Sequence, residues 1–430
     1  MGEESAMSSM SGMSGMESSQ SQGSTGDAPA GGGDVDNDDD SVSPGGGGSS
    51  SSSSSSSPGG GSSDSNPFPG PEPPAPTPEP PPKEPPKNFV MCTVGVRFRD
   101  PGKYKDVPCD YIIFDNMVVI PSGIIPSQDF IAWQHFLEFI AAGSKQPMPG
   151  ISLMGAHLDD PKYDVPEEKT LTSMADKGIV AYGISSLSMP KASTDLPKLT
   201  SKVTSFFSAL TAANSTIAKK GGYMTMFCLV EFQKDSKASF EDFLKQFTGN
   251  LLVVKTHNMD PPAIFPDKCI FYHASMWNDP KGFDFATVED SLKSVKSLPF
   301  AIGVTFSMAV QLAAFNKTGA PTDASAISAC VYRSVTSYDD WCPLRSSEKY
   351  DATTMAVVNV VDIVVVTYNT EPSAKALIAK FKQTVKLTIG VLLTDIQFDI
   401  IETSKCTEKS LSRVKSIGDL IRGQGAKPSP

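Results

Sequence analysis

The stretch VTYNTEPSAKALIAKFKQTVKLTIGVLLTDIQFDI, residues 366–400, combines an apolar strand, a helix and a second apolar strand. Aliphatic side chains recur at helical spacing between Glu371 and Thr384, and the run that opens at Gly390 is almost continuously apolar. This order is typical of a parallel sheet covered by helices. Asp395 and Asp399 close the stretch, and an extended strand would place both carboxylates on one face.

The same alternation of strand and helix runs through most of the chain. Eight strand–helix units in about 340 residues predict a (β/α)8 TIM-type barrel with an insertion after strand 7. The insertion returns through residues 355–368, which are predicted to be buried β-structure. They are too short for a membrane span, and Asn359 and Asp362 interrupt the apolar run. A doubly wound sheet is the alternative, but G-x-G-x-x-G and G-x-x-x-x-G-K-[ST] are both missing, which disfavours its nucleotide-binding forms. The predicted strands span residues 89–98, 109–120, 149–157, 178–188, 223–232, 250–258, 301–310 and 387–398.

Composition separates the predicted barrel from the residues that precede it. Residues 1–65 are a low-complexity Ser/Gly/Asp tail with too few apolar side chains to offset the entropy of ordering, so we expect disorder. Residues 66–87 form a Pro-rich ladder, which favours polyproline II and predicts a semi-rigid spacer. The barrel is expected over residues 88–422, and residues 423–430 are expected to be disordered.

The charge distribution excludes several classes of partner. Residues 1–87 carry 13 acidic and 2 basic side chains, which leaves the body with zero net charge. A nucleic-acid or anionic-membrane binder needs a basic face, so neither partner is expected. No stretch is long and apolar enough to predict a membrane span, and the first residues do not resemble a secretory signal. Nothing in the sequence indicates an oligomeric state.

Cysteines and glycosylation motifs nevertheless favour an extracellular or cell-surface location. All seven cysteines lie in the body without a C-x-x-C pair, and Asn214 and Asn316 each begin an Asn-x-Ser/Thr motif. Cys92 and Cys109 are predicted to pair because one polar loop separates them. Cys228 and Cys269 follow neighbouring strands and are a candidate pair, and Cys330 has Cys342 as a near neighbour. A cytosolic protein with buried thiols is the alternative.

Several segments resemble glycoside hydrolase family 18, the chitinases and chitinase-like lectins. Tyr368-Asn369 stands where the family has Tyr-Asp before a Ser- and Lys-containing helix, and Gly390 opens the following strand. Residues 92–117 resemble the first two strands, residues 150–157 the third, and VVKTHN a Met-Thr-Tyr-Asp strand. The resemblance covers about residues 88–420. It implies a barrel with disulfides Cys92–Cys109 and Cys330–Cys406.

The fourth strand departs from the pattern of family 18. Active members carry D-x-x-D-x-D-x-E there, because cleavage needs a proton donor and a carboxylate that supports the cationic centre. Aligned on Gly178, these four positions fall on Lys177, Val180, Tyr182 and Ile184, with Ile184 at the acid. No Asp or Glu occurs between Asp176 and Asp195, so we expect no family 18 hydrolysis. Thr394 falls where the family places a sugar-stacking Trp.

Polar side chains at the ends of the predicted strands define a candidate binding rim at the C-terminal mouth of the barrel. Its members are Asp115, His157, His257, Asn258, Trp277 and Asp395. The four histidines lack metal-ligand spacing, so no metal is expected, and no motif indicates a cofactor.

Two hypotheses follow from the residues and from the resemblance. The first is a catalytically inactive chitinase-like barrel that acts as an extracellular carbohydrate- or protein-binding module. The alternative is a hydrolase whose site has moved to the rim, with an unknown reaction. Asp395 and Asp399 are interpreted as part of the barrel architecture.

Overall fold

The computed structural model describes residues 85–104, 106–143, 147–155, 158, 166–218, 224–258, 269, 271, 273–279, 283–316, 330–342 and 348–423, with side chains of α4 up to residue 213. The chain divides into two units, residues 1–77 and 78–430, and every described residue belongs to the second. The predictions for the tail, for most of the Pro-rich ladder and for residues 424–430 therefore lie outside the described residues.

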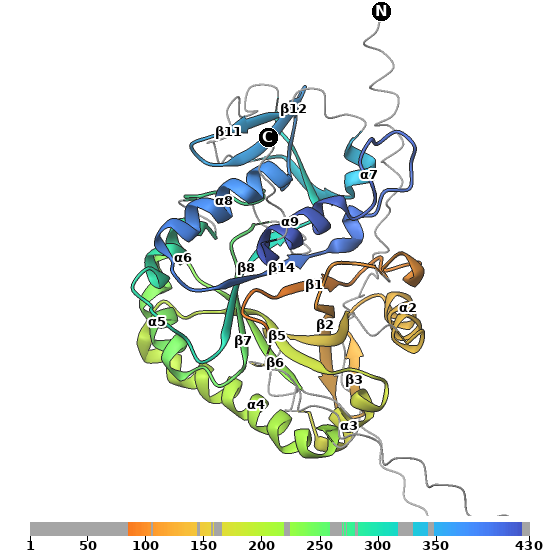
Figure 1. Ribbon diagram of the computed structural model, residues 1–430, viewed down its shortest axis with the longest axis vertical. Coiled ribbons are helices and arrows are strands. Elements are labelled where there is room, and N and C mark those ends of the chain that lie inside the picture. Colours follow the sequence, from red (N-terminus) through yellow and green to blue (C-terminus); the bar gives the residue numbers. More distant parts are fainter. Residues whose placement is uncertain are drawn as a thin grey trace, which may run out of the picture. The chain divides into compact units, whose positions relative to one another are not determined.

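Eight parallel strands close into a barrel, which confirms the predicted fold class (Figure 1). β1 pairs with β14 on one side and with β2 on the other, so the sheet has no gap between its first and last strands. The barrel strands, in spatial order, are β1 (Val90–Val94), β14 (Ile389–Thr394), β8 (Ala301–Ser307), β7 (Leu251–Val254), β6 (Thr225–Glu231), β5 (Ala181–Ser188), β4 (Met148–Met154) and β2 (Tyr111–Ile120).

Helices follow most of the barrel strands, as the alternation predicts. They are α2 (Phe130–Ala141), α3 (Glu168–Asp176), α4 (Leu196–Ala218), α5 (Lys237–Gln246), α6 (Phe285–Leu292), α8 (Glu371–Thr384) and α9 (Ser412–Arg422). Single turns of 3-10 helix lie at η2 (Pro101–Tyr104), η4 (Ser193–Asp195), η5 (Lys234–Ser236) and η7 (Ile396–Asp399). Within the described residues, none of these helices has the length and apolarity needed to cross a membrane.

A short hairpin and a capping aspartate precede α2. A short strand, β3 (Gly123–Pro126), folds back on β2 as an antiparallel hairpin before the helix begins. The N-cap is Asp129, whose carboxylate accepts a hydrogen bond from the backbone N–H of Ala132 at 2.9 Å. The same carboxylate accepts from the backbone N–H of Arg97 and pairs with the Arg99 guanidinium. Asp129 therefore links the loop after β1 to α2.

Apolar side chains pack in two layers on either side of the barrel wall. The interior layer includes Phe89, Met91, Ala181 and Phe227, and the outer layer joins the strands to the helices. Strand glycines make room for the interior rings: a Cβ at Gly390 would collide with the ring of Phe89, and one at Gly183 with that of Phe227. The interior is therefore filled, as barrel interiors generally are.

The insertion between β8 and α8 forms a second sheet (Figure 1). Its strands are β10 (Tyr332–Thr336), β9 (Val310–Ala314), β13 (Val364–Thr367), β12 (Ala356–Val361) and β11 (Lys349–Asp351), in antiparallel order. Residues 355–368 contribute β12 and β13, which confirms their prediction as β-structure. A short helix, α7 (Tyr338–Trp341), lies in the same insertion.

Candidate functional site at the barrel mouth

The direction of the side chains on β5 decides which positions could act on a substrate at the mouth. Ala181 belongs to the interior layer, whereas Tyr182 and Ile184 belong to the outer layer. The Tyr182 hydroxyl donates to the backbone carbonyl of Ile179 at 3.1 Å, and burial raises its pKa. Tyr182 and Ile184, the positions that the resemblance aligned with two of the family carboxylates, therefore face the helices and not the barrel interior.

Strand alternation then gives Ala181, Gly183 and Ser185 as the inward-facing positions of β5. Ser185 is buried, and its hydroxyl donates to the carbonyl of Leu153 at 3.3 Å. These positions place no acidic side chain on the interior face of β5. Lys177 and Val180 precede the strand: Lys177 is the C-cap of α3.

A buried ion pair at the ends of β6 and β7 occupies the mouth, and the sequence reasoning missed it. Lys255 Nζ lies 2.8 Å from the Glu231 carboxylate, with side-chain exposures of 3% and 13%. The Lys255 ammonium also lies over the ring of Phe283, 4.8 Å from its centroid. The sequence did contain a signal for this pair, namely a lysine inside the apolar run LLVVKTHN. A lysine is rarely buried unless it is paired, so its position in this run indicates a buried acidic partner.

His257 crosses the mouth from β7 towards β8 and β14. Its Nδ1 lies 2.6 Å from the Thr305 hydroxyl, and its Nε2 lies 3.5 Å from the Thr394 hydroxyl. Thr394 is the position at which the resemblance led us to expect the family's sugar-stacking Trp, and here its hydroxyl lies beside the His257 imidazole. All three side chains are buried.

Asn258 is used to hold the loop between β7 and α6. Its amide donates to the Asp279 carboxylate at 3.0 Å and accepts from the backbone N–H of Phe283 at 2.8 Å. Its side chain is buried. These bonds identify Asn258 as a positioning residue for the loop.

The remaining predicted rim residues lie on other parts of the mouth. The Asp115 carboxylate accepts hydrogen bonds from the Ser152 hydroxyl of β4 and from the backbone N–H of Asn116. Asp395 follows β14 and receives a bond from the Gln397 amide at 3.3 Å. His157 lies outside the described residues.

Trp277 packs on the outside of the barrel beside α6 and α8. Its backbone N–H donates to the carbonyl of Thr354 at 2.8 Å, and Lys380 Nζ lies 4.1 Å from the ring centroid. The indole also packs against the outer layer. The cation on one ring face and the packing leave little of Trp277 for stacking on a sugar.

Asp395 and Asp399 do not share a strand face, which corrects the expectation from two-residue periodicity. β14 ends at Thr394, Asp395 adopts a left-handed backbone with φ of 58°, and η7 follows. Asp399 is fully buried and pairs with Arg413 Nε at 2.6 Å. Burial raises the pKa of the Asp399 carboxyl, although Arg413 opposes that change.

Arg413 also contacts residues at both ends of the insertion. Its guanidinium donates to the carbonyls of Met308 at 2.6 Å and Asn369 at 3.2 Å, and it lies 4.3 Å from the centroid of the Tyr338 ring. These contacts connect α9 to both ends of the insertion. The interpretation of Asp399 as part of the architecture therefore agrees with its contacts.

The structure contains three disulfides; one expected pairing is confirmed, and the three other pairings considered are wrong. Cys92–Cys109 is confirmed. Cys330 pairs with Cys269 rather than with Cys406 or Cys342, because Cys269 lies beside it and the Cys330 N–H donates to the Cys269 carbonyl at 3.0 Å. Cys228 does not pair with Cys269. It is the free, buried cysteine of β6, within the outer layer, and burial raises its thiol pKa.

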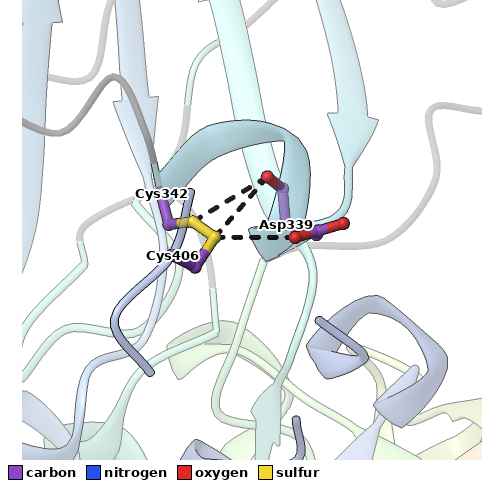
Figure 2. A group of neighbouring side chains, drawn as sticks. All are labelled: Asp339, Cys342 and Cys406. Carbon is purple, nitrogen blue, oxygen red and sulfur yellow. Dashed lines mark hydrogen bonds between the residues drawn. A yellow bond between two sulfur atoms is a disulfide. The ribbon is translucent and has the colours of Figure 1, made fainter. Parts of the chain in front are cut away.

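The third disulfide, Cys342–Cys406, joins the end of α7 to the segment before α9 (Figure 2). Asp339 Oδ1 lies 3.5 Å from Cys406 Sγ, and ligand atoms of the three residues lie within 4.8 Å of one another. Such a group could hold a metal if both cysteines were thiolates, but the disulfide removes the thiolate ligands.

The two glycosylation motifs differ in what the structure shows. Asn316 is exposed just after β9. The side chain of Asn214, in α4, lies outside the described residues. The structure is therefore compatible with modification at Asn316.

Comparison with known proteins identifies the fold. No protein-family model matches the chain, and no curated protein matches it. Catalytic domain 2 of a group II chitinase from Ostrinia furnacalis aligns with a TM-score of 0.59 and 14% identity, covering 80% of this chain and 98% of that chain. A chitinase-like agglutinin from Robinia pseudoacacia aligns at 0.55 and 10%, covering 77% and 99%. An immunomodulatory active chitinase from Trichuris suis aligns at 0.56 and 11%, covering 79% and 100%. At these identities, the chain has a chitinase-like fold.

Proposed function

We propose that this chain is a chitinase-like barrel that does not hydrolyse glycosidic bonds and acts as a binding module outside the cell. The observation that supports this most is the inward-facing set Ala181, Gly183 and Ser185 on β5. None can protonate a leaving oxygen or support an oxocarbenium centre, which family 18 chemistry requires. The three disulfides support the extracellular location, because such bonds persist in oxidising compartments.

Of the two ligand classes predicted, the described residues favour a protein over a glycan. Among the described residues at the mouth, His257 is bonded to Thr305 and Thr394, and Lys255 is bonded to Glu231, so these side chains are already engaged with one another. Thr394 also removes an aromatic face on which a sugar could stack. The similarity to an agglutinin fold keeps a glycan as the second candidate.

An exposed apolar patch gives a protein partner a place to bind. We call it the rim patch: Val96 after β1, and Phe130 and Ile131 at the start of α2, with exposed fractions of 43%, 58% and 62%. Asp129 links the two segments through the Arg97 N–H. Large exposed apolar side chains gathered near one edge are typical of interaction surfaces.

The rival function is a relocated hydrolase, and the Lys255–Glu231 pair is the observation that favours it. A carboxylate beside a buried ammonium at the C-terminal end of barrel strands occupies the place where barrel enzymes hold their catalytic groups. Glu231→Gln and His257→Ala separate the two functions. Each would abolish turnover by such an enzyme, whereas a non-hydrolytic module shows no turnover with or without the substitution.

Calorimetric titration with chitopentaose tests the choice of ligand class. We expect no binding at millimolar sugar, and saturable binding that Thr394→Trp strengthens would establish the glycan alternative. For the protein alternative, Phe130→Ser/Ile131→Ser should release a partner captured from extracellular fluid, whereas Tyr350→Ser, an exposed aromatic on β11, should retain it. Equal retention by both variants would exclude the rim patch as the binding surface.

A further inference from the structure

A groove on the side of the barrel away from the mouth has no role in the function just proposed. It has a volume of about 410 Å³ and lies between the end of α5 and the loop that leads from α6 to β8. Both elements run towards the N-terminal ends of β7 and β8, so the groove and the mouth lie at opposite ends of the strands. Its lining includes Glu241, Leu244, Lys245, Phe247, Val295 and Leu298.

The chemistry of the groove combines an apolar floor with one charge of each sign. Leu244 and Phe247 are buried in the floor, and Phe247 packs edge-on against Phe300 at 4.9 Å between centroids. Lys245 and Glu241 lie on the same lining, and Lys245 is exposed while pairing with Asp242 at 2.8 Å. Apolar grooves with an aromatic side chain and flanking charges recognise extended Pro-rich peptides.

The described chain begins beside this groove. Pro85, its first residue, is buried, and Lys87 Nζ lies 3.5 Å from the carbonyl oxygen of Leu298, a residue of the groove lining. Because the chain reaches Pro85 already packed against the body, the residues immediately before it start within reach of the groove. Those residues, 78–84, read PEPPPKE.

The length and charge of this segment match the groove. Residues 80–83 in polyproline II span about 9 Å, and the α5 residues 241–247 rise by about 9 Å along the helix. Glu79 and Glu84 can pair with Lys245, and Lys83 can pair with Glu241. Prolines also lose little backbone entropy when they bind, which favours docking of a short segment.

We propose that residues 78–84 dock in the groove between α5 and the α6–β8 loop, so that the last part of the Pro-rich ladder is bound to the barrel. The free spacer then ends before residue 78.

Hydrogen exchange on the full chain tests this docking. At the millimolar effective concentration of a short tether, a groove with a Kd near 0.1 mM for the free segment would be occupied about ten times as often as it is empty. Pro80→Gly/Pro81→Gly/Pro82→Gly should therefore raise exchange at the amides of residues 294–298 by up to about tenfold. Pro71→Gly/Pro73→Gly/Pro74→Gly, the matched control in the same ladder, should leave it unchanged.

A peptide titration provides the reciprocal measurement. A synthetic peptide of residues 74–85 should bind the Pro80→Gly/Pro81→Gly/Pro82→Gly chain and should not bind the natural chain, whose groove is already filled. Equal exchange in the natural and triple-glycine chains would overturn the proposal. Protection in the natural chain that falls on dilution would also overturn it, because the occupant would then be a second copy.

Discussion

Breaking the buried pair between Asp399 and Arg413 should destabilise the fold far more than breaking an exposed pair. In Asp399→Asn the amide can still accept from the Val414 N–H, which lies 3.2 Å from the carboxylate, but the guanidinium loses its counter-ion. The Arg413 side chain is only 6% exposed, so water cannot replace that partner. Removal of one partner of a buried pair typically costs about 3–5 kcal/mol, and we expect a loss in that range.

Urea denaturation at pH 7 measures this loss, and three further variants assign it: Lys415→Ala, Arg413→Met and the double variant Asp399→Asn/Arg413→Met. Lys415→Ala breaks the exposed Lys415–Asp419 pair of the same helix, α9, and should change the free energy of unfolding by less than about 1 kcal/mol. The double variant Asp399→Asn/Arg413→Met removes the stranded charge and should be more stable than the sum of the two single losses predicts. A loss below about 1 kcal/mol for Asp399→Asn, or strict additivity, would refute the reasoning.

Three further outcomes follow from the described contacts. Gly390→Ala should lower the free energy of unfolding by about 1–3 kcal/mol, since the new Cβ meets the Phe89 ring, and an unchanged urea midpoint would contradict this packing. Asp129→Ala should cost about 0.5–2 kcal/mol at neutral pH, and Asp129→Asn less. Burial alone would raise the pKa of the Asp129 carboxyl, but the Arg97 and Ala132 N–H groups and Arg99 lower it. The stabilisation by Asp129 is therefore present above pH ~3.9 and is lost as the pH falls through the lower folded pKa. Denaturation at pH 2 should accordingly show a smaller difference in stability between the natural chain and Asp129→Ala. Alkylation with iodoacetamide should label no cysteine in the folded chain, one after denaturation without reductant and all seven after reduction, and labelling of all seven without reductant would contradict the three disulfides.

Periodicity predicted the barrel well because each strand carries its own signal. The strands are apolar on both faces, and the helices between them repeat every three to four residues, so the order of elements is local information. The same applies to Cys92–Cys109, which one loop separates. The insertion was predicted as β-structure, but its antiparallel sheet was not, since pairing among distant strands is set by contacts that no single segment contains.

The site was predicted less completely, for the same reason. Which side chains of β5 face the barrel interior depends on a register that the composition does not fix. The alignment on Gly178 therefore could not show that Tyr182 and Ile184 both pack outward. Lys255 and Glu231 are separated by a helix in sequence and meet only when β6 and β7 pair. The disulfide partners of Cys330 and Cys406 likewise depend on contacts between segments 61 and 64 residues apart in the sequence.

Incubation with chitopentaose, analysed by mass spectrometry, tests most directly whether this chitinase-like barrel is non-hydrolytic. The natural chain and Glu231→Gln should both leave the pentasaccharide intact over many hours at high protein concentration. Shorter oligosaccharides released by the natural chain, and no longer released by Glu231→Gln, would contradict the proposed function and establish a relocated active site at the Lys255–Glu231 pair.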